Sequence, residues 1–354
     1  MSDFRSDTVT RPTAAMKQAM FDAPLGDDVF GDDPTVNRLQ DMAAEMLGFE
    51  AALFAPSGTQ TNLIALMTHC QRGDEAIVGQ QWHTYRWEAG GMAVLGSIQP
   101  QPLAHQPDGT IALDDIESTI KPDDQHFART RLIVMENTTG GKVLPIAYMQ
   151  AVRELARRHG LRTHIDGARL FNAAVALATE SGGDALAQAR KICASYDSLS
   201  LCLSKGLGAP VGSLLLGSAS FVQQAKRHRK MLGGAMRQAG MLAAAGIHAL
   251  QHHVERLAQD HAHAALLADT LTKAVASRPR LAGQIVVHPA QTNMVFTDVA
   301  GEVADEFLAH LAARNVQVTS GPPRKHAGKT IRWVTHLDVG LADIEHVRGV
   351  IAAF

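Results

Sequence analysis

The chain has 354 residues, a formal net charge of -2 and 46% hydrophobic residues. This length predicts about two domains around a large core, and the near-balanced charge argues against nucleic acid or an anionic membrane as partner. No apolar run approaches the roughly 20 residues of a membrane span, and residues 1–7 lack the apolar core of a signal peptide. We therefore expect a cytoplasmic protein with a small-molecule partner.

The three cysteines, Cys70, Cys193 and Cys202, are far apart in the sequence and set among apolar residues. An odd number of distant cysteines fits neither a disulfide framework nor a metal knuckle. We expect reduced thiols in the core.

Helical periodicity runs over about residues 13–23, and a turn-rich segment over 26–34 leads into a second helix. Asp33 is its expected N-cap and Pro34 its first helical residue. Gly48 ends this helix.

A short predicted strand over 50–55 is followed by the turn Ser57-Gly58-Thr59 and a helix over 60–70. Small residues at a helix start leave backbone N–H groups free and place the positive end of the helix dipole there, which suits a phosphate. Most such turns bind nothing, so this signal is weak alone. Neither a Walker lysine nor a dinucleotide-binding glycine pattern follows the turn.

Strands and helices then keep alternating. The predicted strands cover 76–78, 131–135, 161–165 and 198–203, and the predicted helices cover 85–95, 146–160 and 220–231. Such alternation predicts right-handed crossovers and an α/β fold with a mainly parallel sheet. Ligands of these sheets bind beyond the carboxyl ends of the strands.

Polar residues follow several of these strands directly. They are Ser57 to Thr59, His83, Asp166 with Arg169, and Lys205. Because the carboxyl ends of parallel strands meet at one edge, these side chains can converge. Each has an ordinary alternative; Lys205, for example, can be a solvated lysine at the junction of a strand and a loop.

The remaining sequence predicts a long helical region over about 236–276 and then a second alternation of short strands and helices. We expect a large domain over residues 1–245, including an N-terminal arm, and a smaller α+β domain over 246–354.

A protein that binds pyridoxal phosphate needs three groups: a lysine that forms an imine, a carboxylate that keeps the pyridine nitrogen protonated, and an anion site for the phosphate. Lys205, Asp166 and the Ser57 to Thr59 turn supply these residue types. Burial at the end of a strand favours the neutral amine of lysine, the form that attacks a carbonyl. An imidazole at His83 can stack on the ring or move protons.

Several motifs resemble those of the low-specificity L-threonine aldolases, and they occur in the family's order along almost the whole chain. They are Arg5-Ser-Asp-Thr-Val-Thr-Arg-Pro12, Gly26-Asp-Asp-Val-Phe-Gly-Asp-Asp-Pro34, Ser57-Gly-Thr-Gln-Thr-Asn62, Glu88-Ala-Gly-Gly91, His164-Ile-Asp-Gly-Ala-Arg-Leu170, Leu203-Ser-Lys-Gly-Leu-Gly-Ala-Pro-Val-Gly212 and Val334-Thr-His-Leu-Asp338. The resemblance implies the aspartate-aminotransferase-like fold type I, with pyridoxal 5'-phosphate as cofactor and no metal. It also implies a homotetramer with active sites at dimer interfaces, and cleavage of L-threonine or L-allo-threonine to glycine and acetaldehyde.

The resemblance also implies roles for individual residues. Lys205 forms the imine, Asp166 holds the pyridine nitrogen, His83 stacks on the ring, and Ser57, Gly58 and Thr59 hold the phosphate. Ser6, Arg169 and Arg332 bind the substrate carboxylate, with Arg169 also near the cofactor, and His126 is a second active-site histidine. An arginine fork suits a carboxylate and sets the orientation of the amino acid over the ring.

Two features of this sequence leave questions open within the resemblance. Phe30 stands where the family commonly has a tyrosine, so a hydroxyl often found near the site is missing. The loop around 231–237 has cations that reach a neighbouring cofactor phosphate in the family, and the sequence does not select among Arg229, Lys230 and Arg237.

Two other functions compete with this reading. Another pyridoxal-phosphate lyase, such as a phenylserine aldolase or a β-eliminating enzyme, would carry the same lysine and aspartate. A zinc site is the second, because His248 and His252 have helical i, i+4 spacing with Glu255 close by, and His253, His261 and His263 follow. A solvated histidine-rich helix explains that spacing better, since no catalytic glutamate motif accompanies it.

Overall fold

The computed structural model describes residues 1–321 and 328–354. The chain forms two compact units: a large unit, Pro12–Val254, and a small unit made of Met1–Arg11 and Glu255–Phe354. The sequence placed the boundary at residue 245, which falls within a helix of the large unit, and placed the N-terminal arm with the large domain. The first residues belong to the small unit because β1 (Ser2–Asp3) pairs in parallel with β11 (Val316–Gln317).

The large unit is built on a seven-stranded sheet with the order β2-β8-β7-β6-β5-β3-β4. The strands are β2 (Ala51–Ala55), β3 (Glu75–Gly79), β4 (Gln99–Leu103), β5 (Thr130–Glu136), β6 (Arg162–Gly167), β7 (Ser198–Cys202) and β8 (Ser213–Gly217). All neighbours pair in parallel except β8, which is antiparallel to both β2 and β7. The predicted α/β class with a mainly parallel sheet is confirmed.

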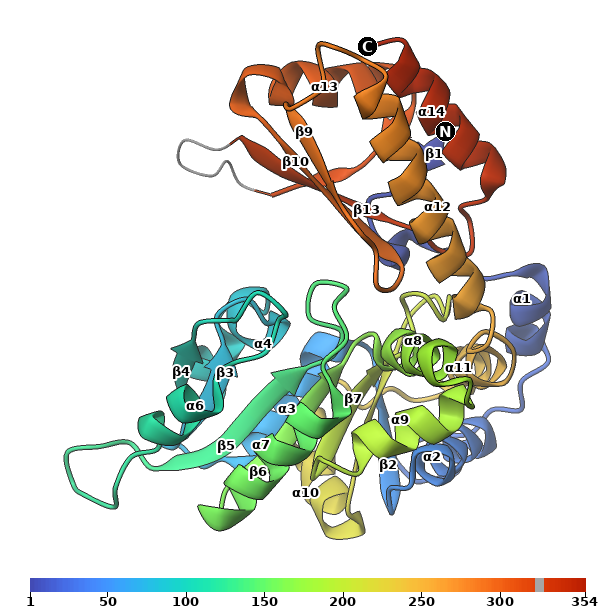
Figure 1. Cartoon of the computed structure of the whole chain (residues 1–354). Helices are drawn as coiled ribbons and strands as arrows, with labels where there is room; N and C mark the ends of the chain where they lie inside the picture. The colour runs from blue at the N-terminus through green and yellow to red at the C-terminus, as the bar shows by residue number, and fades with distance from the viewer. Residues whose placement is uncertain (322–327) are drawn as a thin grey trace. The chain divides into compact units, whose positions relative to one another are not determined.

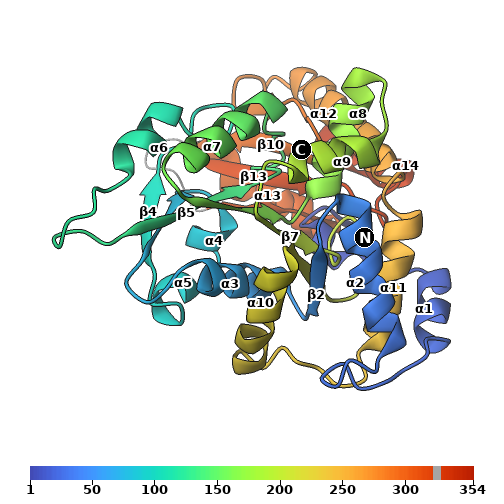
Figure 2. The ribbon, with the colours of Figure 1, turned by 90° about the horizontal axis from the view of Figure 1, so that it is seen from below.

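Helices cover both faces of this sheet, as parallel crossovers require. Figure 2 shows α7 and α9 on one face and α3 and α10 on the other. The helices of this unit are α1 (Ala14–Phe21), α2 (Pro34–Leu47), α3 (Gly58–His69), α4 (His83–Arg86), α5 (Gly91–Val94), α6 (Leu113–Thr119), α7 (Ile146–Arg158), α8 (Leu170–Ser181), α9 (Ala185–Cys193), α10 (Ala219–Met231) and α11 (Gly240–His252). The three cysteines are buried and unpaired, as expected.

Two predicted helices are each divided in the structure. The helix expected over 85–95 is interrupted between α4 and α5, because Ala89 and Gly90 adopt left-handed backbone angles, with φ of 53° and 70°. Such angles end a right-handed helix. The helical region expected over 236–276 is two helices, α11 and α12 (Leu257–Ala276), and the chain passes from one unit to the other between them.

The small unit contains a four-stranded antiparallel sheet with the order β12-β13-β10-β9. Its remaining elements are the 3-10 turn Asp7–Val9, β9 (Ile285–His288), β10 (Met294–Val299), α13 (Gly301–Ala313), β12 (Thr319–Ser320), β13 (Lys329–Val334) and α14 (Leu341–Ala352). Figure 1 shows α12 and α14 beside this sheet. None of the helices within residues 1–321 and 328–354 has the length and apolar character that crossing a membrane requires.

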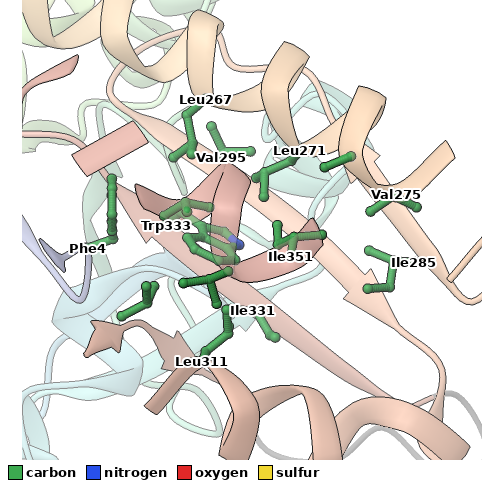
Figure 3. Packing of buried hydrophobic residues seen from close by; sticks show 14 of the residues in the cluster. Phe4, Leu267, Leu271, Val275, Ile285, Val295, Leu311, Ile331, Trp333 and Ile351 are labelled. Atoms are coloured by element: carbon green, nitrogen blue, oxygen red, sulfur yellow. The ribbon is translucent and has the colours of Figure 1, made fainter. Parts of the chain in front are cut away.

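The core of the small unit gathers around the indole of Trp333 on β13 (Figure 3). The indole is fully buried, donates a hydrogen bond to Thr297 Oγ1 at 3.1 Å and meets the ring of Phe4 edge-on at 5.9 Å. Successive side chains of a strand alternate between its faces. Burial of Trp333 in the core therefore directs its neighbour Arg332 to the opposite face of the sheet.

Candidate active site

Three strand ends meet at the carboxyl edge of the large sheet. Glu136 ends β5 and is paired in register with Asp166 on β6, which in turn is paired with Ser200 on β7. Lys205 follows β7 within three residues. The register of the parallel strands therefore places the residues that follow them close together, as predicted.

The Asp166 carboxylate is buried and accepts hydrogen bonds at both oxygens. Oδ1 accepts from the backbone N–H of Ala168 at 2.9 Å, and Oδ2 accepts from Asn62 Nδ2 at 2.8 Å. Asn62 lies on α3, more than 100 positions away in the sequence. A carboxylate held in this way offers a fixed acceptor to a protonated nitrogen of a bound ring.

His83 is the first residue of α4 and is tied to the same group. Its Nδ1 lies 2.8 Å from Glu88 Oε1, and its backbone N–H donates to Glu136 Oε2 at 2.6 Å. Asn62 Nδ2 also donates to Glu88 Oε1 at 2.8 Å, so one amide bridges Glu88 and Asp166. A ring nitrogen of His83 and one carboxylate oxygen each from Glu88 and Asp166 all lie within 4.8 Å of one another.

Burial and mutual proximity shift the protonation of this cluster. Burial, reinforced by the nearby Asp166, raises the pKa of Glu136 to about 8. The hydrogen bond to Glu88 raises the pKa of His83, while burial raises the pKa of Glu88. Both partners of this pair therefore hold a proton more strongly than the isolated groups would.

Replacement of Glu136 by glutamine should flatten the dependence of stability on pH. The folded chain keeps the Glu136 proton up to about pH 8, whereas the unfolded chain releases it near the ordinary value of 4.5. In the original chain, the free energy of unfolding should fall by up to about 1.4 kcal/mol per pH unit as the pH rises between these two values. Glu136→Gln should remove this fall. Urea unfolding of the cofactor-free protein between pH 5 and pH 8 measures the pH dependence of the free energy of unfolding.

The exposed Glu154 supplies a matched control on α7, since its carboxylate is 60% exposed. Glu154→Gln should leave the pH dependence of the original chain in place. Identical pH dependence in the original chain and in Glu136→Gln would contradict the assignment of the proton to Glu136.

Lys205 lies in a tight turn that begins after β7. The backbone N–H of Gly208 donates to the carbonyl of Lys205 at 2.8 Å, and Gly208 has a φ of 76°, which favours a residue without a side chain. Lys205 is one of the charges that act on His83. Among the described residues no hydrogen bond joins its amine to another group, so the amine is available to a ligand.

The start of α3 has the backbone geometry expected of an anion site. Ser57 has extended backbone angles, and its hydroxyl accepts from Gln60 N–H at 3.2 Å. Within the described part of the chain the N–H groups of Gly58 and Thr59 have no hydrogen-bond partner, as is normal in the first turn of a helix. These donors, together with Asp166 and Lys205, fit the three groups of pyridoxal phosphate.

The loop after α10 packs against this helix start. Gln60 Nε2 donates to the carbonyl of Leu232 at 3.1 Å, and a Cβ atom at Gly234 would overlap the Gln60 side chain. Of the three cations left open by the sequence, Arg229 is buried and pairs with Asp28 at 2.8 Å. Within this chain it therefore stabilises the segment 26–34.

Arg237 pairs with Asp27 at 3.1 Å, which fixes the same segment from a second side. Phe30, in the middle of this segment, is 77% exposed. Its ring therefore packs little against the rest of the described chain.

Arg169 lies at the start of α8, directly after the Asp166 turn. Its positive charge acts on Glu136. Arg169 also lines a small cavity with Gly206 and Leu207, the two residues that follow Lys205. The large unit therefore brings together Arg169, the lysine turn and the buried carboxyl cluster.

Ser6 and Arg332 lie in the small unit and are close to each other. Arg332 Nη2 donates to the carbonyl of Arg5 at 3.0 Å, and Ser6 is the next residue. The Ser6 hydroxyl accepts from Thr8 N–H at 3.3 Å and caps the short turn Asp7–Val9. The N-terminal arm and β13 thus hold both residues in one place.

His126 is not part of this cluster in the chain. It precedes β5, at the end of that strand opposite to Glu136, in the long loop that Figure 1 shows extending beyond the tail of β5. Its side chain is 74% exposed, and its Nδ1 lies 2.6 Å from Asp124 Oδ1. The His126 side chain is therefore exposed, at the end of β5 opposite to Glu136.

The histidine-rich end of α11 does not form a three-ligand metal group. Rings of His248 and His252 lie 4.6 Å apart, and His253 is buried with Nδ1 at 2.7 Å from the carbonyl of Leu207. Within residues 1–321 and 328–354, the one group of three or more such ligands is His83, Glu88 and Asp166. His253 instead fixes the turn that carries Lys205.

Sequence reasoning missed Asn62, Glu88 and Glu136 as members of the site. Asn62 and Glu88 stand inside motifs that carry the resemblance, but their roles depend on contacts between distant segments. Glu136 directly follows a predicted strand, as Asp166 does, and that position was the available signal.

Comparison with known proteins shows which family the chain is similar to. The beta-eliminating lyase family matches residues 3–302. The chain is 51% identical to the low specificity L-threonine aldolase of Escherichia coli K12 over 354 residues, which cover the whole chain and 99% of that protein. It is 42% identical to the low-specificity L-threonine aldolase 1 of Arabidopsis thaliana, over 97% of this chain and 93% of that one.

Solved structures share the fold. The threonine aldolase of Leishmania major has a TM-score of 0.82 at 20% identity and covers 100% of this chain and 99% of its own. The serine palmitoyltransferase of Sphingomonas wittichii has a TM-score of 0.74 at 17% identity, over 99% and 86%. The expected fold type I is confirmed, and the identities over full length show that the chain belongs to the low-specificity L-threonine aldolases within the beta-eliminating lyase family.

Proposed function

We propose that this chain uses pyridoxal 5'-phosphate to cleave L-threonine, L-allo-threonine and related β-hydroxy-α-amino acids to glycine and the corresponding aldehyde, acetaldehyde in the first two cases. The observation that carries the proposal is the convergence of Lys205, Asp166 and the start of α3 at one sheet edge in a chain of this family. When bound, the cofactor supplies an electron sink next to Cα.

The residues of the large unit hold the cofactor. The amine of Lys205 would hold the cofactor at its aldehyde, and the Asp166 carboxylate would accept a hydrogen bond from its ring nitrogen. The N–H groups of Gly58 and Thr59 and the hydroxyl of Ser57 bind the phosphate. His83, held through Nδ1 by Glu88, presents its ring face and Nε2 to the ligand.

Ser6, Arg169 and Arg332 bind the substrate carboxylate. Their chemistry supports this role, because a guanidinium fork and a hydroxyl both donate to carboxylate oxygens. Fixing the carboxylate would orient the amino acid, and this orientation would decide which bond at Cα is cleaved. These three residues would therefore favour cleavage between Cα and Cβ.

His83, alone or through a water that His126 also contacts, accepts the proton of the β-hydroxyl. The exposed position of His126 supports a role toward a neighbouring subunit. We therefore propose a homotetramer with active sites at dimer interfaces, located in the cytoplasm. Three buried, unpaired cysteines are consistent with a reducing compartment.

Product analysis tests this function. Purified protein supplied with pyridoxal phosphate should convert L-threonine and L-allo-threonine to equal amounts of glycine and acetaldehyde. The comparison of initial rates between the two substrates measures the preference at Cβ. Formation of a keto acid and ammonia in place of glycine would instead identify a β-eliminating enzyme, and faster cleavage of phenylserine than of threonine would identify a phenylserine aldolase.

A further inference from the structure

A line of polar side chains, which begins at the half-buried His69, leads to Asp166. His69 Nε2 lies 2.7 Å from Ser198 Oγ, which lies 2.8 Å from His164 Nδ1. His164 Nε2 lies 3.2 Å from Asn62 Oδ1, and Asn62 Nδ2 lies 2.8 Å from Asp166 Oδ2. We call His69, Ser198, His164 and Asn62 the histidine relay.

The sheet and α3 together place these groups in line. His164 and Asp166 are two residues apart on β6, so they share one face of the sheet. His164 is paired in register with Ser198 on β7. Helix α3, which contributes both His69 and Asn62, packs on these two strands.

The donors and acceptors of the relay have only one consistent direction. The amide Nδ2 of Asn62 faces two carboxyl groups, Asp166 and Glu88, so its Oδ1 faces His164 and needs a proton on His164 Nε2. A neutral His164 then has a bare Nδ1, which accepts from the Ser198 hydroxyl. The Ser198 oxygen in turn accepts from His69 Nε2–H.

Burial keeps both imidazoles in the neutral form that this direction needs. Burial lowers the pKa of His164 to about 3 and that of His69 to about 4. Neither ring therefore gains a second proton near neutral pH. Reversal of the relay would turn the Asn62 oxygen toward two carboxyl groups and lose two hydrogen bonds.

We propose that the histidine relay is a one-way chain of donors that holds Asp166 as a fixed acceptor for the ring nitrogen of the cofactor. This inference rests on the proposed function, because it assigns the relay to the same cofactor site. The members of the relay are positioning residues: they act through Asp166 and contact neither cofactor nor substrate.

Ser198→Ala tests the relay, and Ser195→Ala is its matched control. Both serines are buried, and Ser195 precedes β7, at the end of that strand opposite to Lys205 and outside the relay. We measure the dissociation constants of pyridoxal phosphate and of its 1-deaza analogue, which lacks the ring nitrogen. Ser198→Ala should weaken pyridoxal phosphate binding by roughly 3- to 10-fold, the range for one buried hydrogen bond, and leave the analogue nearly unchanged.

Ser195→Ala should leave the affinities for both compounds nearly unchanged. Equal losses in the two serine variants, or equal losses for the cofactor and its analogue in Ser198→Ala, would overturn the relay. If the original chain binds neither compound, the proposed function fails.

Nitrogen NMR of the original chain with labelled histidine tests the direction of the relay without any variant and without activity. His164 should be neutral and protonated at Nε2 from pH 6 to pH 8. A proton at Nδ1, or a mixture of the two neutral forms, would refute the relay even if Ser198→Ala does not fold.

Discussion

Lys205→Ala should abolish turnover of L-threonine and remove the visible absorption of the lysine-bound cofactor. Lys205 is the lysine next to the Asp166 cluster, and its amine has no hydrogen-bond partner among the described residues. Loss of a nucleophile that forms a covalent bond typically costs roughly 10⁴-fold or more in turnover. Initial rates of glycine formation and an absorption spectrum of the protein with added cofactor give both readouts.

Lys205→Arg separates the charge of this residue from its nucleophilicity. A guanidinium keeps the positive charge that acts on His83, but it stays protonated and cannot form the imine. It should therefore be as inactive as Lys205→Ala. Borohydride reduction followed by peptide mass analysis should find the cofactor attached to Lys205 in the original chain.

Lys226→Ala, a change of an exposed lysine on α10, is the control and should keep full activity. Wild-type-like turnover in Lys205→Ala, or a cofactor attached to a different lysine, would refute the assignment.

The parallel sheet could be predicted because its signals are local. Each strand is a short apolar run, and polar residues that follow it fall at the carboxyl edge by topology alone. Asp166 and Lys205 were found in this way, although 39 positions separate them, since the register of β6 and β7 brings neighbouring strand ends together.

Some elements could not be predicted, because their amino-acid sequence is typical of a different structure from the one that they adopt in the fold. Strand β4 contains Pro100 and Pro102 and reads as a loop, yet it forms the edge of the large sheet, where a missing N–H costs little. The break at Ala89 has no sequence signature, because alanine rarely adopts a positive φ. This break separates α4 from α5 just after Glu88.

Contacts between distant segments set the rest of the site. Asn62 reaches both Glu88 and Asp166, which lie 26 and 104 positions away. The spacing of these residues in the sequence does not predict these hydrogen bonds, because they form only when α3 packs on β6. The pairing of residues 1–11 with the C-terminal part of the chain escaped prediction for the same reason.

Asp166→Asn should lower turnover by roughly 10²- to 10³-fold, the usual cost of removing one preorganised electrostatic contact from an active site. The carboxylate accepts at both oxygens from protein donors, Ala168 N–H and Asn62 Nδ2. An amide can satisfy only one of them and directs its own NH₂ group at the other. It also removes the negative charge that favours a protonated ring nitrogen.

Asp197→Asn is the matched control for Asp166→Asn, because Asp197 precedes β7 at the opposite edge of the same sheet. Its carboxylate binds Arg153 at 2.7 Å and the backbone N–H of Thr163 at 2.8 Å. Loss of these contacts should lower the melting temperature while turnover per folded, cofactor-loaded molecule stays near that of the original chain. Asp166→Asn should instead lose turnover even when the protein is saturated with cofactor. Equal turnover losses in the two variants would show that Asp166 acts through stability alone.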